Sequence, residues 1–249
     1  FNPVHEYVNR LHFNYRDHRK IACIDGDVAY TGGVNIADEY ANLIERFGYW
    51  KDSGVCLEGE GAWGLTASFI RMCVNLGGVM HNEHDYYRPH TPVKSEGFCQ
   101  PFTDGPQNNP DNPAEDVFLQ MISGARRFLY ITTPYFIPDE SLMRALCIAG
   151  DGGVDVRLML PGKPDHWYAD CVAESYFGEL IKHGVKVYRY TPGFLHGKSI
   201  MVDREAAFVG SANMDYRSFE LDYECGVMVY SVPMIESLLE DCLLYTSDA

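Results

Sequence analysis

The sequence lacks a long hydrophobic run and an excess of positive charge. No stretch of 18 apolar residues occurs in its 249 residues, so no segment reads as a membrane-spanning helix. The net charge of −15 disfavours a nucleic-acid-binding protein, because such proteins need lysine and arginine to displace counterions from phosphates. A small anionic substrate stays compatible with this charge, since a few cations can dominate one cleft.

The sequence also lacks a cysteine framework. Its eight cysteines form no Cys-x-x-Cys pair, and most lie in apolar runs such as Ile21–Ile24 and Cys225–Val229. We therefore expect free, buried thiols in a reducing compartment rather than disulfides. Hydrophobic residues make up 46% of the chain, which is enough for a folded core.

One motif occurs twice and organises the chain. Residues His18–Asp25 and His196–Asp203 both read His-x-Lys-x4-Asp, and the second copy lies 178 residues after the first. Two copies are not expected by chance when residues further along also match, and they indicate two similar lobes. The matching downstream pairs are Gly32 and Gly210, Gly33 and Ser211, and Asn35 and Asn213.

The residues around the second copy alternate between helical and strand patterns. Such alternation favours a parallel or mixed sheet that is covered on both faces. The predicted fold class is α/β, with two lobes related by a pseudo-twofold axis, each a mixed sheet flanked by helices. The predicted helices are Phe118–Arg126, Asp139 or Ser141 to Ala149, and Tyr168–Lys182; the predicted strands are Phe128–Thr133, Val154–Leu160, Val185–Tyr190, Ser199–Val202 and Ala206–Val209.

We divide the chain into a first lobe, residues 1–79, and a second lobe, residues 114–242. Residues 80–113 are rich in Pro, Asn, Gly and His and are expected to form a linker or surface excursion. Only 17 residues precede the first motif, and the chain begins with Phe rather than Met. The first lobe is therefore predicted to be truncated, with the native protein extending N-terminally. Residues 243–249 break the helical pattern of Val232–Cys242 and are expected to be a tail of doubtful origin.

The two motifs are candidate catalytic half-sites. Alternate residues of a strand face the same side, so His18 is expected to project with Lys20, and His196 with Lys198. The ammonium groups would neutralise phosphate oxygens, while an imidazole attacks phosphorus or moves a proton. Two histidines allow one to attack and the other to protonate the leaving alcohol.

Further residues are expected to support this chemistry. Asn35, Asn213 and Ser211 lie at small-residue turns and are candidate phosphate-binding residues beside the two motif lysines. Asp52 and Glu224 precede similar apolar strands, 34 and 28 residues after the histidine of the same half. They are our candidates for holding the second ring nitrogen of each histidine.

The motif aspartates, Asp25 and Asp203, lie out of phase with the face that carries histidine and lysine. We expect them to brace the turn after each strand rather than to take part in chemistry. No metal is expected. His81, His84 and His90 lack cysteine or carboxylate partners at a tight spacing and are read as a polar loop.

Four polar or aromatic residues fall at the ends of strands or loops, on the side where sites form in α/β proteins. They either line a lipid-facing cleft or pack in the core and rim, and the sequence leaves both open. These residues are Tyr135, Phe136, His166 and Trp167.

At these residues the sequence resembles the phospholipase D superfamily, whose signature is the paired His-x-Lys-x4-Asp motif. Within the superfamily it is most similar to bacterial cardiolipin synthases. The stretches that carry this similarity are His18–Gly26, Tyr30–Tyr40, Phe47–Asp52, Thr133–Leu142, Lys163–His166, Gly193–His196 and Gly210–Phe219.

The resemblance implies a phosphatidyltransferase, a cardiolipin synthase that joins two phosphatidylglycerols through a phosphatidyl-histidine and releases glycerol. It implies His18 as the nucleophile and no metal or organic cofactor. The implied partners are phosphatidylglycerol and a membrane surface, and the implied place is the bacterial inner membrane with the catalytic region facing the cytoplasm. The family's N-terminal membrane helices are lacking here.

Other functions would use the same residues. A phospholipase D hydrolase would accept water in place of the second lipid, and other phosphatidyltransferases would accept another alcohol. A nuclease of the superfamily is disfavoured by the net charge of −15. A non-catalytic membrane scaffold is expected to have eroded motifs, whereas both motifs are intact here.

Overall fold

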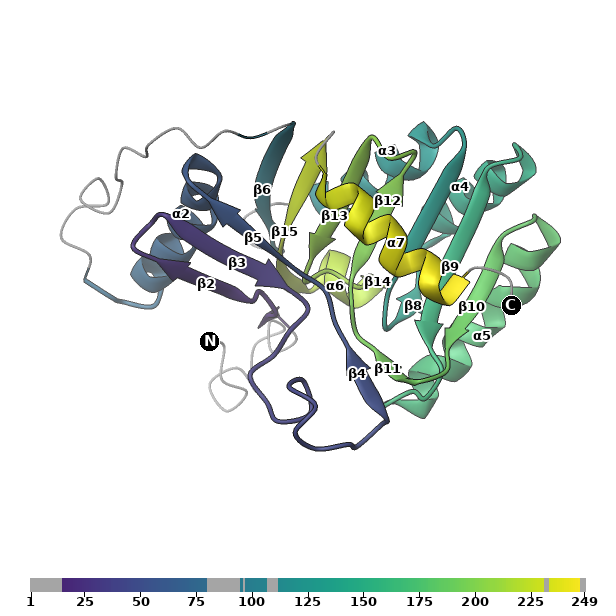
Figure 1. The fold of residues 1–249 in the computed structure, drawn as a ribbon, viewed down its shortest axis with the longest axis horizontal. Helices are drawn as coiled ribbons and strands as arrows, with labels where there is room; N and C mark the ends of the chain where they lie inside the picture. The colour runs from purple at the N-terminus through teal and green to yellow at the C-terminus, as the bar shows by residue number, and fades with distance from the viewer. Residues whose placement is uncertain (1–14, 80–94, 96, 107–111, 231–232, 247–249) are drawn as a thin grey trace.

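The structure is a computed structural model that describes residues 15–79, 95, 97–106, 112–230 and 233–246. Its largest feature is an eight-stranded mixed sheet flanked by helices, and a three-stranded sheet lies beside it (Figure 1). The α/β class with a large mixed sheet is thus confirmed. The large sheet runs β1 (Arg16–Asp17), β15 (Asp222–Tyr230), β13 (Ala206–Gly210), β12 (Ser199–Val202), β7 (Phe128–Thr132), β9 (Asp155–Pro161) and β10 (Lys186–Tyr190), and β6 (Phe98–Asp104) also pairs with β15.

The remaining elements cover this sheet or connect its strands. The small sheet runs β2 (Ile21–Ile24), β3 (Val28–Gly32) and β5 (Gly54–Glu58). Two short pairs are β11 (Gly193–Leu195) with β4 (Tyr49–Lys51), and β14 (Met214–Asp215) with β8 (Phe136–Ile137). The helices are α2 (Glu60–Asn75), α3 (Pro113–Gly124), α4 (Glu140–Asp151), α5 (Trp167–Lys182), α6 (Tyr216–Glu220) and α7 (Met234–Thr246).

A separate hydrophobic core lies on each face of the large sheet. In β7, Leu129 and Ile131 join the core beneath α3, α4 and α5, while Tyr130 points into the core beneath α7. Neighbouring strands alternate in the same way, because successive side chains of a strand face opposite sides. The second core continues into the small sheet and α2 through Val55 and Leu65. Burial on both faces explains why these strands read as nearly continuous apolar runs.

Two short parallel strand pairs join the chain around the first motif to the chain around the second. Asp17 in β1 pairs with Tyr223 in β15, and Leu195 in β11 pairs with Lys51 in β4. The next residue in each case is a motif histidine. His18 N donates to Tyr223 O at 3.0 Å, and His196 N donates to Lys51 O at 2.7 Å. This reciprocity agrees with a pseudo-twofold relation, although the two-lobe division and its boundaries stay predictions.

The predicted elements of the second half agree with the structure to within a few residues, except at the start of α3. This helix begins at Pro113 rather than Phe118. Proline suits the first turn of a helix, and Asp104 accepts a hydrogen bond from Ala114 N at 2.9 Å. The alternative caps for α4 are also resolved, because Asp139 accepts from Leu142 N at 2.8 Å.

Two segments differ from the sequence-based expectation. The expected linker, 80–113, contains β6, which pairs with β15 along its whole length. The sequence concealed this strand because it carries Pro101 and no clear apolar alternation. The expected tail begins inside α7, which continues to Thr246 rather than ending at Cys242. The Tyr245 ring packs 5.0 Å from Tyr190, so the end of this helix belongs to the packed structure.

The cysteines are free, as expected, but they are not all buried. Cys56, Cys99 and Cys171 are exposed, and only Cys225 and Cys242 are fully buried. Cys56 lies on the exposed face of β5, whereas the thiol of Cys99 on β6 lies beside Gly61 of α2. No helix within the described ranges is long and apolar enough to cross a bilayer.

Candidate active site

The second motif lies where β11 leads into β12. His196 and Lys198 occupy the short link between these strands, so neither is part of a strand as the sequence had suggested. His196 Nδ1 lies 2.7 Å from Asp52 Oδ2, and both side chains are 6% exposed. Asp52 directly follows β4, and the pairing of β4 with β11 brings it to His196. The carboxylate fixes Nδ1 as the protonated nitrogen and leaves Nε2 for chemistry.

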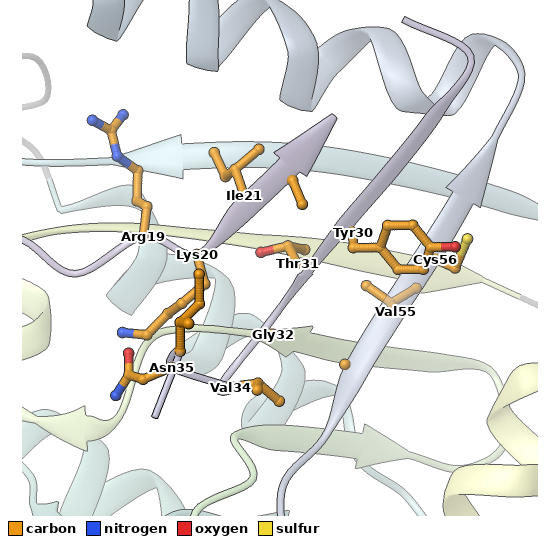
Figure 2. A pocket seen from close by; sticks show the side chains of 13 residues that line it. Arg19, Lys20, Ile21, Tyr30, Thr31, Gly32, Val34, Asn35, Val55 and Cys56 are labelled. Carbon is orange, nitrogen blue, oxygen red and sulfur yellow. The ribbon is translucent and has the colours of Figure 1, made fainter. Parts of the chain in front are cut away.

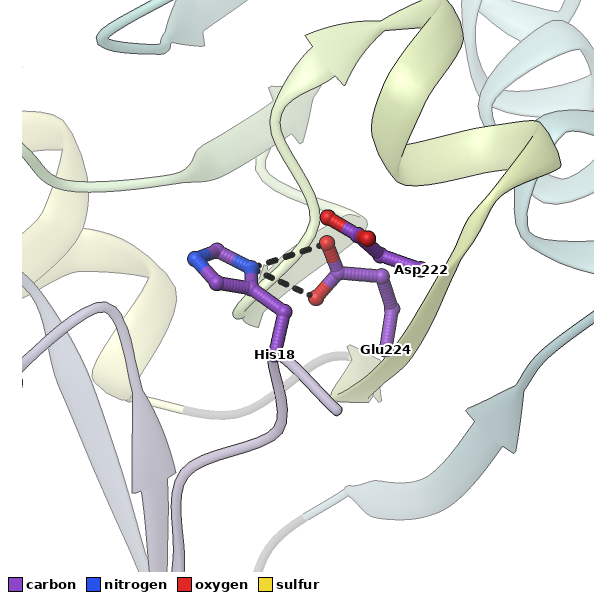
Figure 3. A group of neighbouring side chains, drawn as sticks. All are labelled: His18, Asp222 and Glu224. Atoms are coloured by element: carbon purple, nitrogen blue, oxygen red, sulfur yellow. Dashed lines mark hydrogen bonds and ion pairs between the residues drawn. The ribbon is translucent and has the colours of Figure 1, made fainter. Parts of the chain in front are cut away.

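The first motif has the same arrangement, with β1 leading into β2. His18 Nδ1 lies 2.9 and 3.1 Å from the two carboxylate oxygens of Glu224, as Figure 3 shows. The Ser211 hydroxyl donates to Glu224 Oε2 at 2.5 Å. Burial opposes the charge of Glu224, but the charge of His18 and these hydrogen bonds outweigh it and lower the pKa of the carboxyl.

The carboxylates are exchanged between the two halves. Asp52 follows His18 in the first half and Glu224 follows His196 in the second, yet Asp52 holds His196 and Glu224 holds His18. Each histidine is therefore oriented by the half that does not contain it. Since neither half holds its own imidazole, both halves are needed for either histidine to be placed.

The two halves use different carboxylates because of the residue at the preceding turn. Ser211 supports the longer Glu224 with its hydroxyl. At the matching position, a Cβ on Gly33 would overlap the Asp52 carboxylate. Asp52 instead accepts from Ser53 N at 2.8 Å. The shorter carboxylate, Asp52, is thus paired with glycine at the turn, and the longer one, Glu224, with serine. Ser211 positions Glu224, whereas we had predicted that its hydroxyl would bind a phosphate.

The motif lysines fold back onto their own histidines. Lys198 Nζ donates to His196 O at 2.5 Å and lies 3.0 Å from both ring nitrogens. Lys20 Nζ donates to His18 O, also at 2.5 Å. In the second motif the lysine thus lies on the same side of the chain as its histidine. Each ammonium group retains hydrogen-bond donors for a phosphate oxygen.

The positive charges of the two motifs act on one another. Burial lowers the pKa of Lys198 to about 7, and the charge of Lys20 acts in the same direction. Burial and the charge of Lys198 lower the pKa of His196 to about 4, against the hydrogen bond with Asp52, and Lys20 contributes here too. Burial also lowers the pKa of Lys20. An anionic phosphate would relieve this crowding of positive charge.

An aromatic wall surrounds His196, and sequence reasoning did not predict it. The ring centroids of Tyr40, Trp50 and Phe194 lie 5.2, 5.4 and 5.8 Å from that of the imidazole. Trp50 and Phe194 are paired residues of β4 and β11. The sequence did carry a signal for this wall, because aromatic residues come shortly before both the carboxylate and the histidine. Trp50 precedes Asp52 in Tyr-Trp-Lys-Asp52, and Phe194 precedes His196. The wall excludes water from this half of the site.

The two candidate phosphate-binding asparagines differ in their partners. Asn35 is half-buried, and its amide donates to the Tyr40 hydroxyl at 2.5 Å. Asn213 is buried, its backbone N–H donates to Ser218 Oγ at 3.1 Å, and its side-chain oxygen has no partner among the described residues. Asn213 follows the Ser211 turn and so lies beside the Glu224 carboxylate that holds His18. Their roles with a phosphate stay predictions.

The motif aspartates lie at the far ends of β2 and β12, away from the lysines. Asp203 accepts hydrogen bonds from the backbone N–H groups of Arg126, Arg127 and Phe128, each at 2.8 Å. It therefore ties the end of β12 to the start of β7. Asp25 is exposed and has no hydrogen-bond partner within the described part of the chain. The expected bracing role is thus visible in only one half.

One group of side chains has a spacing that a metal ion could use. His18, Asp222 and Glu224 offer ligand atoms within 4.8 Å of one another (Figure 3). However, both Glu224 oxygens and His18 Nδ1 already bind one another. Burial and the charge of Glu224 raise the pKa of Asp222 to about 6, which weakens it as a ligand. His81, His84 and His90 lie outside the described residues.

A hollow of about 760 Å³ opens beside the first motif. Lys20 and Asn35 lie together at one end of it, and Tyr30, Val55 and Cys56 lie at the other (Figure 2). The hollow therefore joins the polar groups of the site to an apolar surface on the small sheet. Such a combination suits a ligand with a phosphate head and an apolar body.

The fold is similar to those of two solved proteins. It matches phosphatidylserine synthase of Haemophilus influenzae with a TM-score of 0.65 at 16% identity, over 93% of this chain and 61% of that one. It also matches Nuc of Salmonella typhimurium, a phospholipase D family member, with a TM-score of 0.50 at 22% identity, over 60% of this chain and 94% of that one. Fold and paired motifs together define the phospholipase D class.

Within the phospholipase D class, the sequence comparisons identify a narrower family. The family model of the phospholipase D-like domain of cardiolipin synthase matches residues 118–242, and the chain belongs to this family. It is 41% identical over 247 residues to a cardiolipin synthase of Listeria welshimeri, covering 98% of this chain and 50% of that one. A cardiolipin synthase of Halalkalibacterium halodurans is 41% identical over 243 residues, covering 97% and 48%. The chain thus spans about half the length of these relatives.

Proposed function

We propose that this chain carries the catalytic region of a cardiolipin synthase. Such an enzyme moves a phosphatidyl group from one phosphatidylglycerol to a hydroxyl of another and releases glycerol. The observation that carries the proposal is the exchanged pair, in which Asp52 holds His196 and Glu224 holds His18 through Nδ1. Two oriented imidazoles beside two ammonium groups supply an attacking base, a proton carrier and charge neutralisation for a phosphodiester.

The reaction proceeds in two steps. Nε2 of His18 attacks phosphorus, the bond from phosphorus to the glycerol oxygen breaks, and His196 gives that oxygen a proton. A hydroxyl of the second phosphatidylglycerol then attacks phosphorus, the phosphorus–nitrogen bond breaks, and His196 takes the hydroxyl proton. Lys20 and Lys198 neutralise the equatorial oxygens in both steps. No metal is required at any step, so the activity is expected to survive chelation by EDTA.

The accessibility of the two histidines supports His18 as the nucleophile. The His18 side chain is 27% exposed, and Figure 3 shows its second ring nitrogen pointing away from the Glu224 and Asp222 carboxylates. His196 is 6% exposed, with Lys198 over its ring and aromatic side chains around it. Its pKa of about 4 reflects burial and the charge of Lys198. A bound phosphodiester anion would offset that charge and raise the pKa toward the range of a proton donor.

A lipid substrate at a membrane surface is supported by exposed apolar side chains near the site. Ile36 and Leu43 lie on the segment that follows the first glycine turn, and both are largely exposed. Trp167, at the start of α5, is 75% exposed. We propose that these residues face the bilayer and that the enzyme works at the cytoplasmic side of the bacterial cell membrane.

The test is incubation of the enzyme with phosphatidylglycerol vesicles, with products separated by mass spectrometry. We expect cardiolipin and free glycerol in equal amounts, and loss of both in His18→Ala and in His196→Ala. His183→Ala is the matched control, because His183 also binds a carboxylate through Nδ1, from Asp151, at an exposed place outside the site. Phosphatidic acid as the sole lipid product would instead indicate a hydrolase. Full activity of both site variants would exclude the proposed chemistry.

A further inference from the structure

One histidine outside the two motifs, His166, lies beside both a carboxylate and a tyrosine hydroxyl. His166 Nδ1 lies 2.9 Å from Asp165 Oδ2, and the Tyr135 hydroxyl donates to the same oxygen at 2.7 Å. Asp165 and His166 follow β9 and precede α5, while Tyr135 lies between β7 and β8. The hydrogen-bond partner of His166 Nδ1 is the Tyr135 hydroxyl, at 3.3 Å, so Tyr135 lies between the imidazole and the carboxylate, and no part of the repeated motif contains this group.

This cluster belongs to the wall of the active site. Tyr135 directly precedes β8, whose Phe136 pairs with Met214, so Tyr135 is the neighbour of Asn213 across the parallel ladder. On the other side, the pKa of Tyr40 is raised by burial and by the charges of Asp52 and Asp165. The Tyr40 ring contacts His196 at 5.2 Å. The cluster therefore lies between the second asparagine and the aromatic wall of the catalytic centre.

The cluster presents one accessible group, the imidazole of His166. Its side chain is 49% exposed, whereas Asp165 is 16% exposed and its second oxygen is buried without a partner among the described residues. A shielded carboxylate that receives few hydrogen bonds holds strongly to the donors it has. Because the Tyr135 hydroxyl donates its proton to Asp165, it accepts one from Nδ1 of His166, and Nε2 is left as a hydrogen-bond acceptor at the rim.

We propose that His166 recognises the polyol headgroup of the acceptor by accepting a hydrogen bond from the hydroxyl next to the one that reacts. An acceptor nitrogen beside a carboxylate disfavours a second phosphate group and favours a hydroxyl donor. Glycerol offers a neighbouring hydroxyl, whereas propan-1-ol and water do not. Asp165 and Tyr135 are positioning residues in this scheme, and the inference rests on the proposed phosphatidyl transfer.

The experiment measures the choice of acceptor by competition. The enzyme is given phosphatidylglycerol vesicles with equal concentrations of deuterated glycerol and propan-1-ol, and mass spectrometry measures deuterated phosphatidylglycerol against phosphatidylpropanol. We expect the wild type to prefer glycerol and His166→Phe to lower the product ratio about tenfold, which is the effect of one lost hydrogen bond to a ligand. The KM for glycerol should rise in proportion, while the yield of phosphatidylpropanol is maintained.

Two further variants separate recognition from folding. Asp165→Asn should lower the same ratio, because the amide no longer fixes the imidazole as a charged carboxylate does. His183→Phe, which replaces a carboxylate-bound histidine outside the site, should leave it unchanged. An unchanged ratio in His166→Phe, or an equal fall of both products, overturns the inference while the transfer itself stands. A wild type that forms neither product removes the proposed function and this inference with it.

Discussion

The carboxylate of Asp203 gives the most direct test of the structural account, because its counterpart supplies an internal control. Asp203 and Asp25 occupy the same place in the two motifs and have nearly the same backbone conformation, with φ of 52° and 54°. Alanine at a positive φ costs about 1 kcal/mol at either position. Only Asp203 accepts backbone hydrogen bonds from Arg126, Arg127 and Phe128. The difference between Asp203→Ala and Asp25→Ala therefore isolates these three bonds.

Each hydrogen bond to a charged acceptor contributes about 1.5 kcal/mol, so the three bonds should make the two variants differ by about 4.5 kcal/mol in free energy of unfolding. Equilibrium urea unfolding measures the difference, and an m-value of about 2 kcal/mol/M converts it to a midpoint lower by ~2 M. Burial raises the pKa of Asp203, but the three backbone bonds outweigh it and lower the pKa. The stabilisation is thus present above the unfolded value, and the wild type should lose its advantage over Asp203→Ala as the pH falls below about 4. A difference under ~1 kcal/mol at pH 7 would refute the reasoning.

Two further predictions concern the charged groups of the site. Glu224→Gln should reduce kcat by about 10-fold to 100-fold without unfolding the protein, because His18 loses the carboxylate that fixes its Nδ1–H. Steady-state kinetics measure the reduction, and a folded variant with full activity would contradict the prediction. Burial and the charge of Lys20 lower the pKa of Lys198 to about 7, so sulfate binding at pH 8 should take up a proton onto Lys198. Calorimetry in two buffers of different ionisation enthalpy measures this proton uptake. Lys198→Met should abolish the uptake. No uptake by the wild type would contradict the prediction, because it would mean that Lys198 is already charged.

The chemistry of the site was readable from the sequence because its core is local. The spacing of His196 and Lys198 within three residues puts both groups on one side of the chain, whether or not a strand contains them. The strands and helices of the second half were readable for the same reason, since their periodicity reports burial on each face. The start of α3 and the end of α7 depended on caps and long-range packing and were misplaced.

The exchange of carboxylates could not be read from the sequence. It depends on β1 pairing with β15 and on β4 pairing with β11, strands of only two to nine residues that are far apart in the chain. Counting from each histidine gave Asp52 and Glu224 as the candidate carboxylates, but not which histidine each one holds. The same long-range pairing brings Trp50 and Phe194 to His196. Pairings of this kind follow from tertiary contacts rather than from local pattern.

Other differences arose where a local signal was ambiguous. The hydroxyl of Ser211 suits a phosphate equally well as a carboxylate, and only the position of Glu224 shows which it contacts. The repeat implied equal roles for Asp25 and Asp203. The backbone N–H groups that donate hydrogen bonds to Asp203, however, have no counterpart around Asp25 in the described residues. Sequence symmetry therefore identified matching positions without fixing matching environments.

The central claim, phosphatidyl transfer through a histidine held by the opposite half, is tested most directly by trapping the intermediate. The enzyme is mixed with phosphatidylglycerol labelled at phosphorus, quenched within the first turnover, digested and mapped by mass spectrometry. The account predicts an acid-labile, base-stable phosphatidyl adduct on His18, which Glu224→Gln reduces and Asp25→Ala leaves unchanged. An adduct on another residue type, or turnover to cardiolipin with no adduct on His18 or His196, would contradict it.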